Sequence, residues 1–105
     1  MRMLRGIELR YVLTMHLVTQ GRSTISEMRH ALAFHGFDVA RPAPKSVSDA
    51  LRWERARGRV RRLGRGLCGP GQMARGTEHR INTRVLALRA EAAKSLRGGQ
   101  IAKWV

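Results

Sequence analysis

The chain has 105 residues, of which 43% are hydrophobic and 5% aromatic, so we expect one domain whose single core is filled mainly by aliphatic side chains. Its 21 lysines and arginines against 7 aspartates and glutamates leave a net charge of +14, which repels itself unless a polyanion such as nucleic acid neutralises it. The single cysteine excludes an internal disulfide and the short apolar runs exclude a membrane span or a signal peptide, so we expect a cytoplasmic protein, nucleoid-associated in a bacterial host.

A helix is predicted first, from about Leu4 to Gln20. Apolar residues recur there at the three- and four-residue steps that place side chains on one face of a helix. The stripe consists of Ile7, Tyr11, Met15 and Val18, and it is flanked by Leu9, Leu13 and Leu17. We therefore expect a well-buried helix that ends at Gln20 and Gly21.

A second helix is expected from Thr24 to about His35. Thr24 and Glu27 have the spacing of a capping box, in which each side chain accepts a hydrogen bond from the other residue's backbone N–H. The inward face should consist of Ile25, Met28, Ala31 and Leu32, with Phe34 or Phe37 closing the end. Gly36 is the expected stop.

The third predicted helix follows a loop over residues 38–44, where two prolines disfavour helical structure. Ser46 and Asp49 repeat the capping spacing, so the helix should start near Ser46 and continue to Gly58. Its apolar face consists of Val47, Ala50 and Leu51. Its outer face holds Lys45, Ser48, Asp49, Arg52 and Arg55.

A β-hairpin is predicted after Gly58. Residues 59–63 and 67–71 form its two strands. Gly64 and Gly66 permit the positive φ angles of a tight turn, which would hold Arg65 at the tip. The stretch from the end of the third helix to this tip is strongly basic and contains Arg55, Arg57, Arg59, Arg61, Arg62 and Arg65.

Residues 73–97 are predicted to form a C-terminal helix capped by Thr77, following a domain over residues 1–72. Its apolar stripe consists of Ile81, Val85, Leu88 and Ala92. Two arrangements would bury this stripe: docking on the first helix, or pairing with its copy in a homodimer through the helix over residues 77–96. Residues 98–105 are expected to form a flexible tail in which Trp104 finds a pocket.

Three helices followed by a glycine-punctuated basic hairpin resemble the winged helix-turn-helix family in element order. The stretch from Val47 to Gly66 is similar to that family's recognition helix and wing, because a helix with one apolar face ends in a charged residue and glycine before a strand. The resemblance covers about residues 7–70. It implies a mainly α fold with a small β-hairpin wing plus the C-terminal helix. It also implies a transcriptional regulator on double-stranded DNA, with the third helix in the major groove, the second helix bracing it and the wing on the backbone or minor groove.

The resemblance assigns DNA contacts to polar residues of the third helix and the wing. From the helix these are Lys45, Ser46, Ser48, Asp49, Arg52 and Arg55, and from the wing Arg59, Arg61, Arg62 and Arg65. Arg52 is the candidate reader of guanine, through a bidentate bond to O6 and N7. Asp49 could accept a bond from cytosine N4 or cap the helix with Ser46, and capping is the favoured role. The wing arginines should contact phosphates or the minor groove without reading sequence.

One position departs from the family pattern. Glu54 stands where the family usually places an apolar residue on the inward side of the third helix, and Trp53 lies at the boundary of that face. Either the helix is rotated so that Trp53 is the buried anchor, or Glu54 pairs with a nearby arginine. The rotated helix is the favoured prediction, because burying a carboxylate is costly unless it is paired.

No catalytic, metal or cofactor site is predicted. The four histidines and Cys68 lack metal-ligand spacing, and the chain shows no carboxylate pair or nucleophile motif. We therefore expect no enzyme and no small-molecule ligand. Two alternatives fit the same charge: a winged-helix module that binds an acidic protein partner, and a non-specific RNA- or DNA-binding protein. The shortage of aromatic residues disfavours binding by stacking on single strands.

Overall fold

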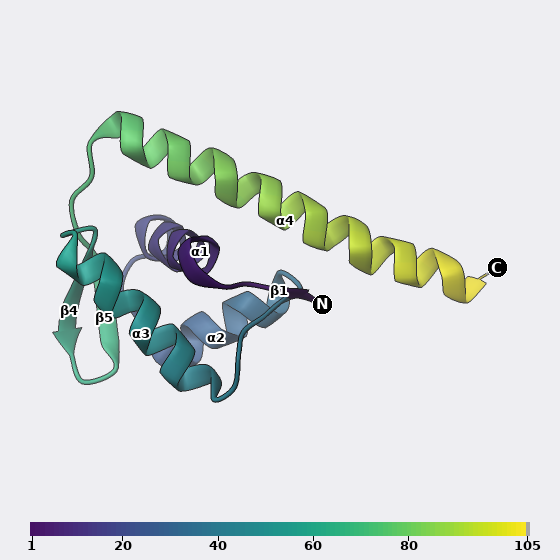
Figure 1. Cartoon of the computed structure of the whole chain (residues 1–105), viewed down its shortest axis with the longest axis horizontal. Helices are drawn as coiled ribbons and strands as arrows, with labels where there is room; N and C mark the ends of the chain where they lie inside the picture. Colours follow the sequence, from purple (N-terminus) through teal and green to yellow (C-terminus); the bar gives the residue numbers. More distant parts are fainter. Residues whose placement is uncertain (105) are drawn as a thin grey trace.

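Over residues 1–104 the fold is mainly helical, with two small sheets (Figure 1). The computed structural model describes the backbone of residues 1–104 and the side chains of residues 1–95. In chain order the elements are β1 (Arg2–Met3), α1 (Gly6–Gln20), β2 (Ser23–Thr24), α2 (Ile25–Phe34), β3 (Phe37–Asp38), α3 (Ala43–Ala56), β4 (Val60–Gly64), β5 (Leu67–Pro70) and α4 (Arg75–Trp104). Helix α1 lies between α4 on one side and α2 and α3 on the other (Figure 1).

The predicted hairpin is confirmed as β4 and β5, and it belongs to a larger sheet. Strand β2 pairs antiparallel with β5, so the sheet has the order β2-β5-β4 and β4 is an edge strand. At the tip, Gly66 has a positive φ of 67°, whereas Gly64 does not adopt this conformation. Strand β2 was not predicted, because a segment of two residues is too short to show the alternation that marks a strand.

A second small sheet pairs β1 with β3 in parallel. It was also not predicted, because each strand has only two residues. The pairing places the start of the chain beside the segment that follows α2, and Leu4 enters the core with 1% exposure.

The buried face of α1 differs from the predicted stripe. Ile7 is 51% exposed, and Tyr11 and Val18 are only half-buried. The buried residues are Leu9, Val12, Leu13, Thr14, Met15 and Leu17. The reason is that α1 packs against α3 on one side and α4 on the other, so residues of two faces are covered.

The capping box at the start of α2 is confirmed. The Glu27 backbone N–H donates to Thr24 Oγ1 at 3.0 Å, and the Thr24 N–H donates to Glu27 Oε1 at 3.0 Å. Met28 is fully buried, as predicted, together with Leu32. Of the two phenylalanines expected to close the end, Phe37 does so and Phe34 is 82% exposed.

Helix α3 begins earlier than predicted, at Ala43. Pro44 lies in its first turn, where the missing N–H has no helical partner to lose. The predicted capping role of Ser46 and Asp49 is therefore wrong. Ser46 Oγ donates to the Ala40 carbonyl at 2.6 Å, and Asp49 accepts a bond from Lys45 Nζ at 2.9 Å. The predicted apolar face is confirmed, because Val47, Ala50 and Leu51 are all buried.

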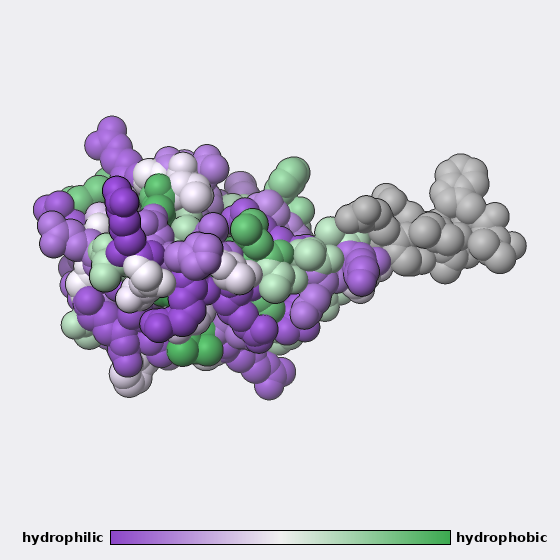
Figure 2. Space-filling model, turned by 90° about the horizontal axis from the view of Figure 1, so that it is seen from above, coloured by the Kyte–Doolittle hydropathy of each residue, from purple (hydrophilic) through white to green (hydrophobic). Residues whose placement is uncertain are grey.

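The apolar stripe of α4 docks on α1, which is one of the two predicted arrangements. Ile81, Val85, Leu88 and Ala92 are at most 2% exposed and belong to the same core as the side chains of α1. This stripe is therefore covered within the chain and is not free to pair with a copy. Seen from the α4 side, the surface is mostly hydrophilic, and apolar colour appears only in separate patches (Figure 2).

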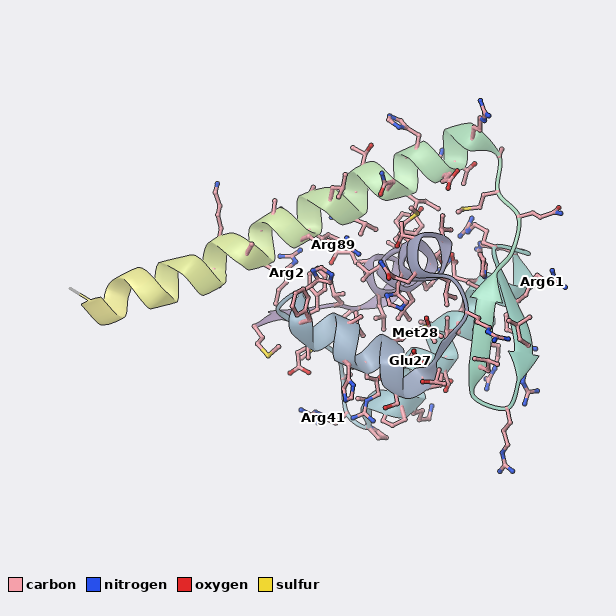
Figure 3. The ribbon with its side chains drawn as sticks, turned by 180° about the vertical axis from the view of Figure 1, so that it is seen from behind. Arg2, Glu27, Met28, Arg41, Arg61 and Arg89 are labelled. Carbon is pink, nitrogen blue, oxygen red and sulfur yellow. The ribbon has the colours of Figure 1, made fainter. Side chains whose placement is uncertain are left out.

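Ion pairs attach the start of the chain to α4. Arg2, which lies beneath α4 in Figure 3, pairs with Glu91 at 3.2 Å and with Glu8 at 3.4 Å. Glu8 also accepts a bond from Arg84 at 2.6 Å. In the segment predicted to be a flexible tail, α4 continues to Trp104. The side chains from residue 96 onward, including the expected pocket for Trp104, lie outside the described part of the chain.

The exit from the hairpin crosses the end of α3 at Gly71. The Gly71 N–H donates to the Arg59 carbonyl at 2.9 Å, and a Cβ at position 71 would collide with the Gly58 carbonyl oxygen. We expect Gly71→Ala to cost about 1–3 kcal/mol of unfolding free energy, measured by urea denaturation, because backbone atoms would have to move apart. The control is Gly76→Ala, where a Cβ meets nothing within 4 Å. Equal stability of the two variants would contradict the expectation.

Candidate nucleic-acid interface

A groove separates α3 from the β4–β5 hairpin. We call it the α3–hairpin groove, and it is lined by Ile25, Ser48, Leu51, Arg52, Arg55, Arg62, Gly64, Gly66, Leu67 and Cys68. Three arginines from two elements therefore meet there, because the return of the chain after Gly58 places β4 beside the outer flank of α3. The groove combines a helix surface and a basic hairpin on one side of the domain.

Of the ten predicted contact residues, Ser48, Arg52, Arg55 and Arg62 line the groove, and three more are exposed outside it. Lys45, Ser48, Arg52 and Arg55 are exposed on α3, and Arg61, Arg62 and Arg65 are exposed on the hairpin. Arg61 projects from the outer edge of the hairpin, away from the rest of the domain (Figure 3). Three predicted residues differ: Ser46 is half-buried and bonded to Ala40, Asp49 is half-buried and bonded to Lys45, and Arg59 is turned inward.

Carboxylates neutralise little of the charge on this surface. Asp49 pairs with Lys45 at 2.9 Å and more loosely with Arg52 at 3.8 Å. The hydrogen bond from Lys45 lowers the pKa of Asp49, so this carboxylate is charged at neutral pH. Within the described side chains, no ion pair involves Arg55 or the three hairpin arginines, Arg61, Arg62 and Arg65. The surface therefore presents guanidinium groups available to an external anion.

The prediction that Trp53 is the buried anchor of α3 is wrong. Glu54 is fully buried, with 0% exposure, whereas Trp53 is 58% exposed. The helix is therefore not rotated. Arg52 lies on its exposed face, as predicted, and Glu54 is directed toward α1. Arg59, which was predicted to contact DNA from the wing, serves as a partner of Glu54.

Glu54 is held by three side chains that we call the Glu54 cluster: Arg10, Thr14 and Arg59. Arg59 binds both carboxylate oxygens, with Nε 2.9 Å from Oε1 and Nη2 2.8 Å from Oε2. Thr14 Oγ1 donates to Oε1 at 2.7 Å, and Arg10 Nε donates to Oε2 at 3.1 Å. The cluster joins α1, α3 and the residue before β4, so it fixes how α3 and the hairpin lie relative to α1.

Pairing explains how a carboxylate is tolerated in this position. Burial by itself raises the pKa of Glu54, but the hydrogen bonds from Arg59, Thr14 and Arg10 outweigh it and leave the pKa below its ordinary value. The sequence contained one signal for this cluster. Arg10 and Thr14 lie four residues apart, on one face of a helix that is otherwise mainly apolar.

The lowered pKa of Glu54 predicts acid sensitivity. A carboxyl group whose folded pKa is depressed stabilises the fold above its unfolded pKa, and that contribution is lost as the pH falls through the folded value. We expect the unfolding free energy of the native protein to fall as the pH decreases below about 4.3, the ordinary glutamate pKa. The fall should be shallower in Glu54→Gln, and equal pH dependence of the two proteins by urea denaturation would contradict this assignment.

Cys68 of β5 and His16 of α1 both have the surroundings of structural side chains. Cys68 is buried, and burial raises the pKa of its thiol, which lowers the fraction of reactive thiolate. His16 Nε2 lies 3.0 Å from Ser23 Oγ, and burial lowers the pKa of this imidazole. Among the described side chains, no group of three histidines, cysteines or carboxylates is arranged to hold a metal ion.

Comparison of the chain with known protein families, with curated proteins and with solved structures found no match. Over the described residues, no helix has the length and apolarity needed to cross a membrane.

Proposed function

We propose that this protein is a DNA-binding domain of the winged helix-turn-helix type and that it acts in transcriptional regulation on double-stranded DNA. The observation that carries the proposal is the α3–hairpin groove, where Arg52, Arg55 and Arg62 converge without a full complement of carboxylates. Arginine is the side chain best suited to this partner, because its planar donors match phosphate oxygens and the guanine edge.

The order of the elements supports the same proposal. Helices α1, α2 and α3 precede the hairpin, and β2 between α1 and α2 adds the third strand to the hairpin's sheet. A winged helix-turn-helix domain has this succession, with α3 as recognition helix and the β4–β5 hairpin as wing.

In the proposed complex, α3 enters the major groove, which is wide enough for one helix. Arg52, with 76% of its side chain exposed, reaches a guanine through O6 and N7. Arg61, Arg62 and Arg65 lie along phosphates or the minor groove and supply affinity that does not depend on sequence. Phosphate neutralisation offsets the self-repulsion of an excess of 14 positive charges.

The Glu54 cluster supports this function by rigidity. It fixes the angle between α3 and the hairpin before any ligand binds, so less conformational entropy is lost when both elements contact one duplex.

The test is selection from a randomised duplex pool, with sequencing of the bound fraction at two salt concentrations. We expect a short motif that stays enriched at the higher salt concentration. Arg52→Ala should relax the preference at one base pair, corresponding to about 1–3 kcal/mol of lost discrimination. Arg80→Ala, an exposed arginine of α4, is the matched control and should leave the motif unchanged.

The same selection separates the alternatives. Binding that disappears at higher salt and enriches no motif would indicate a non-specific nucleic-acid-binding protein. Weak binding that is equally lowered by Arg52→Ala and Arg80→Ala would indicate that the basic surface serves an acidic protein partner instead.

A further inference from the structure

A second groove lies on the other flank of α3. We call it the Trp53 groove, and it is lined by Leu4, Arg5, Gly6, Leu9, Arg10, Ala40, Ser46, Asp49, Ala50 and Trp53. It shares no residue with the α3–hairpin groove, so the two grooves offer separate surfaces on one helix.

Trp53 is an exposed tryptophan with arginines around it. The residue is 58% exposed, and the guanidinium carbons of Arg10 and Arg57 lie 5.7 and 5.8 Å from its ring centroid. Such cation–π contacts hold the ring in place although it extends into solvent. Exposed tryptophan and arginine side chains are among the residue types that contribute most of the binding energy at protein interfaces.

The charge around this groove is mainly positive. Arg5 and Arg10 line it, and Arg57 lies beside Trp53 at its edge. Arg10 is paired with Glu54, and Asp49, the carboxylate among the lining residues, is bonded to Lys45 at 2.9 Å, which leaves Arg5 and Arg57 for a ligand. The floor of the groove is formed by Leu4 and Leu9, which are core residues with 1% and 5% exposure. The complementary ligand therefore carries negative charges outside and an apolar side chain within.

We propose that the Trp53 groove binds an acidic segment of another protein, with an apolar side chain beside the Trp53 ring, over Leu4 and Leu9, and carboxylates on Arg5 and Arg57. This proposal does not depend on DNA binding, because the two grooves are separate. A nucleobase fits less well, because arginines already lie over the ring and stacking would have to displace them. A leucine or phenylalanine can instead fill the apolar interior beside the ring.

Arg10 connects this groove to the rest of the domain. Its guanidinium lies near Trp53, and its Nε donates to Glu54 at 3.1 Å. The same side chain therefore forms the wall of the Trp53 groove and part of the Glu54 cluster. A bound segment would therefore contact an arginine side chain that is already held in place.

The test uses fluorescence anisotropy of a labelled glutamate-rich peptide of about 14 residues, with leucine and phenylalanine at three- and four-residue steps. We expect saturable binding that weakens at least tenfold in Trp53→Ala and in Arg57→Ala. Both residues are exposed, so circular dichroism should show both variants folded. Arg75→Ala, which removes an exposed arginine of α4, is the charge-matched control and should bind the peptide like the native protein.

Two comparison ligands determine what the groove recognises. A peptide of glutamate alone should bind much more weakly, and so should the amphipathic peptide with glutamine in place of glutamate. Equal binding of the all-glutamate peptide, equal loss in Arg75→Ala, or no saturation below millimolar concentration would overturn the proposal. It would also be overturned by a single-stranded oligonucleotide that binds more tightly than the peptide in a Trp53-dependent manner. Duplex binding, measured on the same samples, should persist in both groove variants, so failure here leaves the proposed DNA function intact.

Discussion

Glu54→Gln is expected to lower the free energy of unfolding by about 3 kcal/mol, at the lower end of the range for breaking a buried ion pair. The substitution keeps the shape of the side chain and an oxygen for Thr14, but it removes the negative charge opposite Arg10 and Arg59. Those two side chains are only 15% and 16% exposed, so water replaces the lost charge incompletely. Urea denaturation at pH 7 measures the difference.

An apolar replacement of the whole cluster is the control. In Arg10→Met/Glu54→Leu/Arg59→Met no charge remains buried, so the triple variant should be more stable than the single variant Glu54→Leu. The comparison separates the cost of unpaired arginines from a general intolerance of substitution at this site. If Glu54→Gln or Glu54→Leu were as stable as the native protein, the cluster would not be what holds α3 in place.

Neutralising the hairpin is expected to have the largest effect on the proposed DNA binding. In Arg61→Ala/Arg62→Ala/Arg65→Ala, three phosphate contacts should be lost, each contributing about 0.9 to the slope of log affinity against log salt concentration. The slope should therefore fall by about 2.7, and the affinity for any duplex should fall about 100-fold at 0.15 M salt. Anisotropy titrations at several salt concentrations measure both quantities.

A charge-matched control distinguishes position from total charge. Arg75→Ala/Arg80→Ala/Lys94→Ala removes the same number of exposed positive charges from α4, on the other side of α1 from α3. This variant should lose only a small part of the affinity, because these charges act at long range and salt screens them. Equal losses in the two triple variants would indicate binding by overall charge and contradict a role for the hairpin as a wing.

Several elements could be predicted from the sequence because their signals are local. The Thr24 and Glu27 side chains bond only to backbone within three residues, so their spacing identifies the start of α2 directly. Gly66 and the strands beside it form a turn that needs no distant partner. The stripe of α4 had to be covered, although the sequence left open whether α1 or a second copy would cover it.

Other features depend on contacts between distant parts of the chain. Strands β1, β2 and β3 have two residues each and exist because backbone groups far away in the sequence pair with them. Helix α3 begins three residues before the predicted start, because Ser46 has the spacing of a cap but bonds to the preceding loop.

The sequence by itself determined that this is a basic, mainly helical domain with an arginine-rich hairpin after its third helix. Only the tertiary structure decided which side of that helix faces outward. Glu54 lies inward because Arg10 and Thr14, which are 44 and 40 residues away, supply the hydrogen bonds that make its burial tolerable. A carboxylate is costly or acceptable in a core according to its partners, and residue spacing along the chain does not specify partners that only folding brings together.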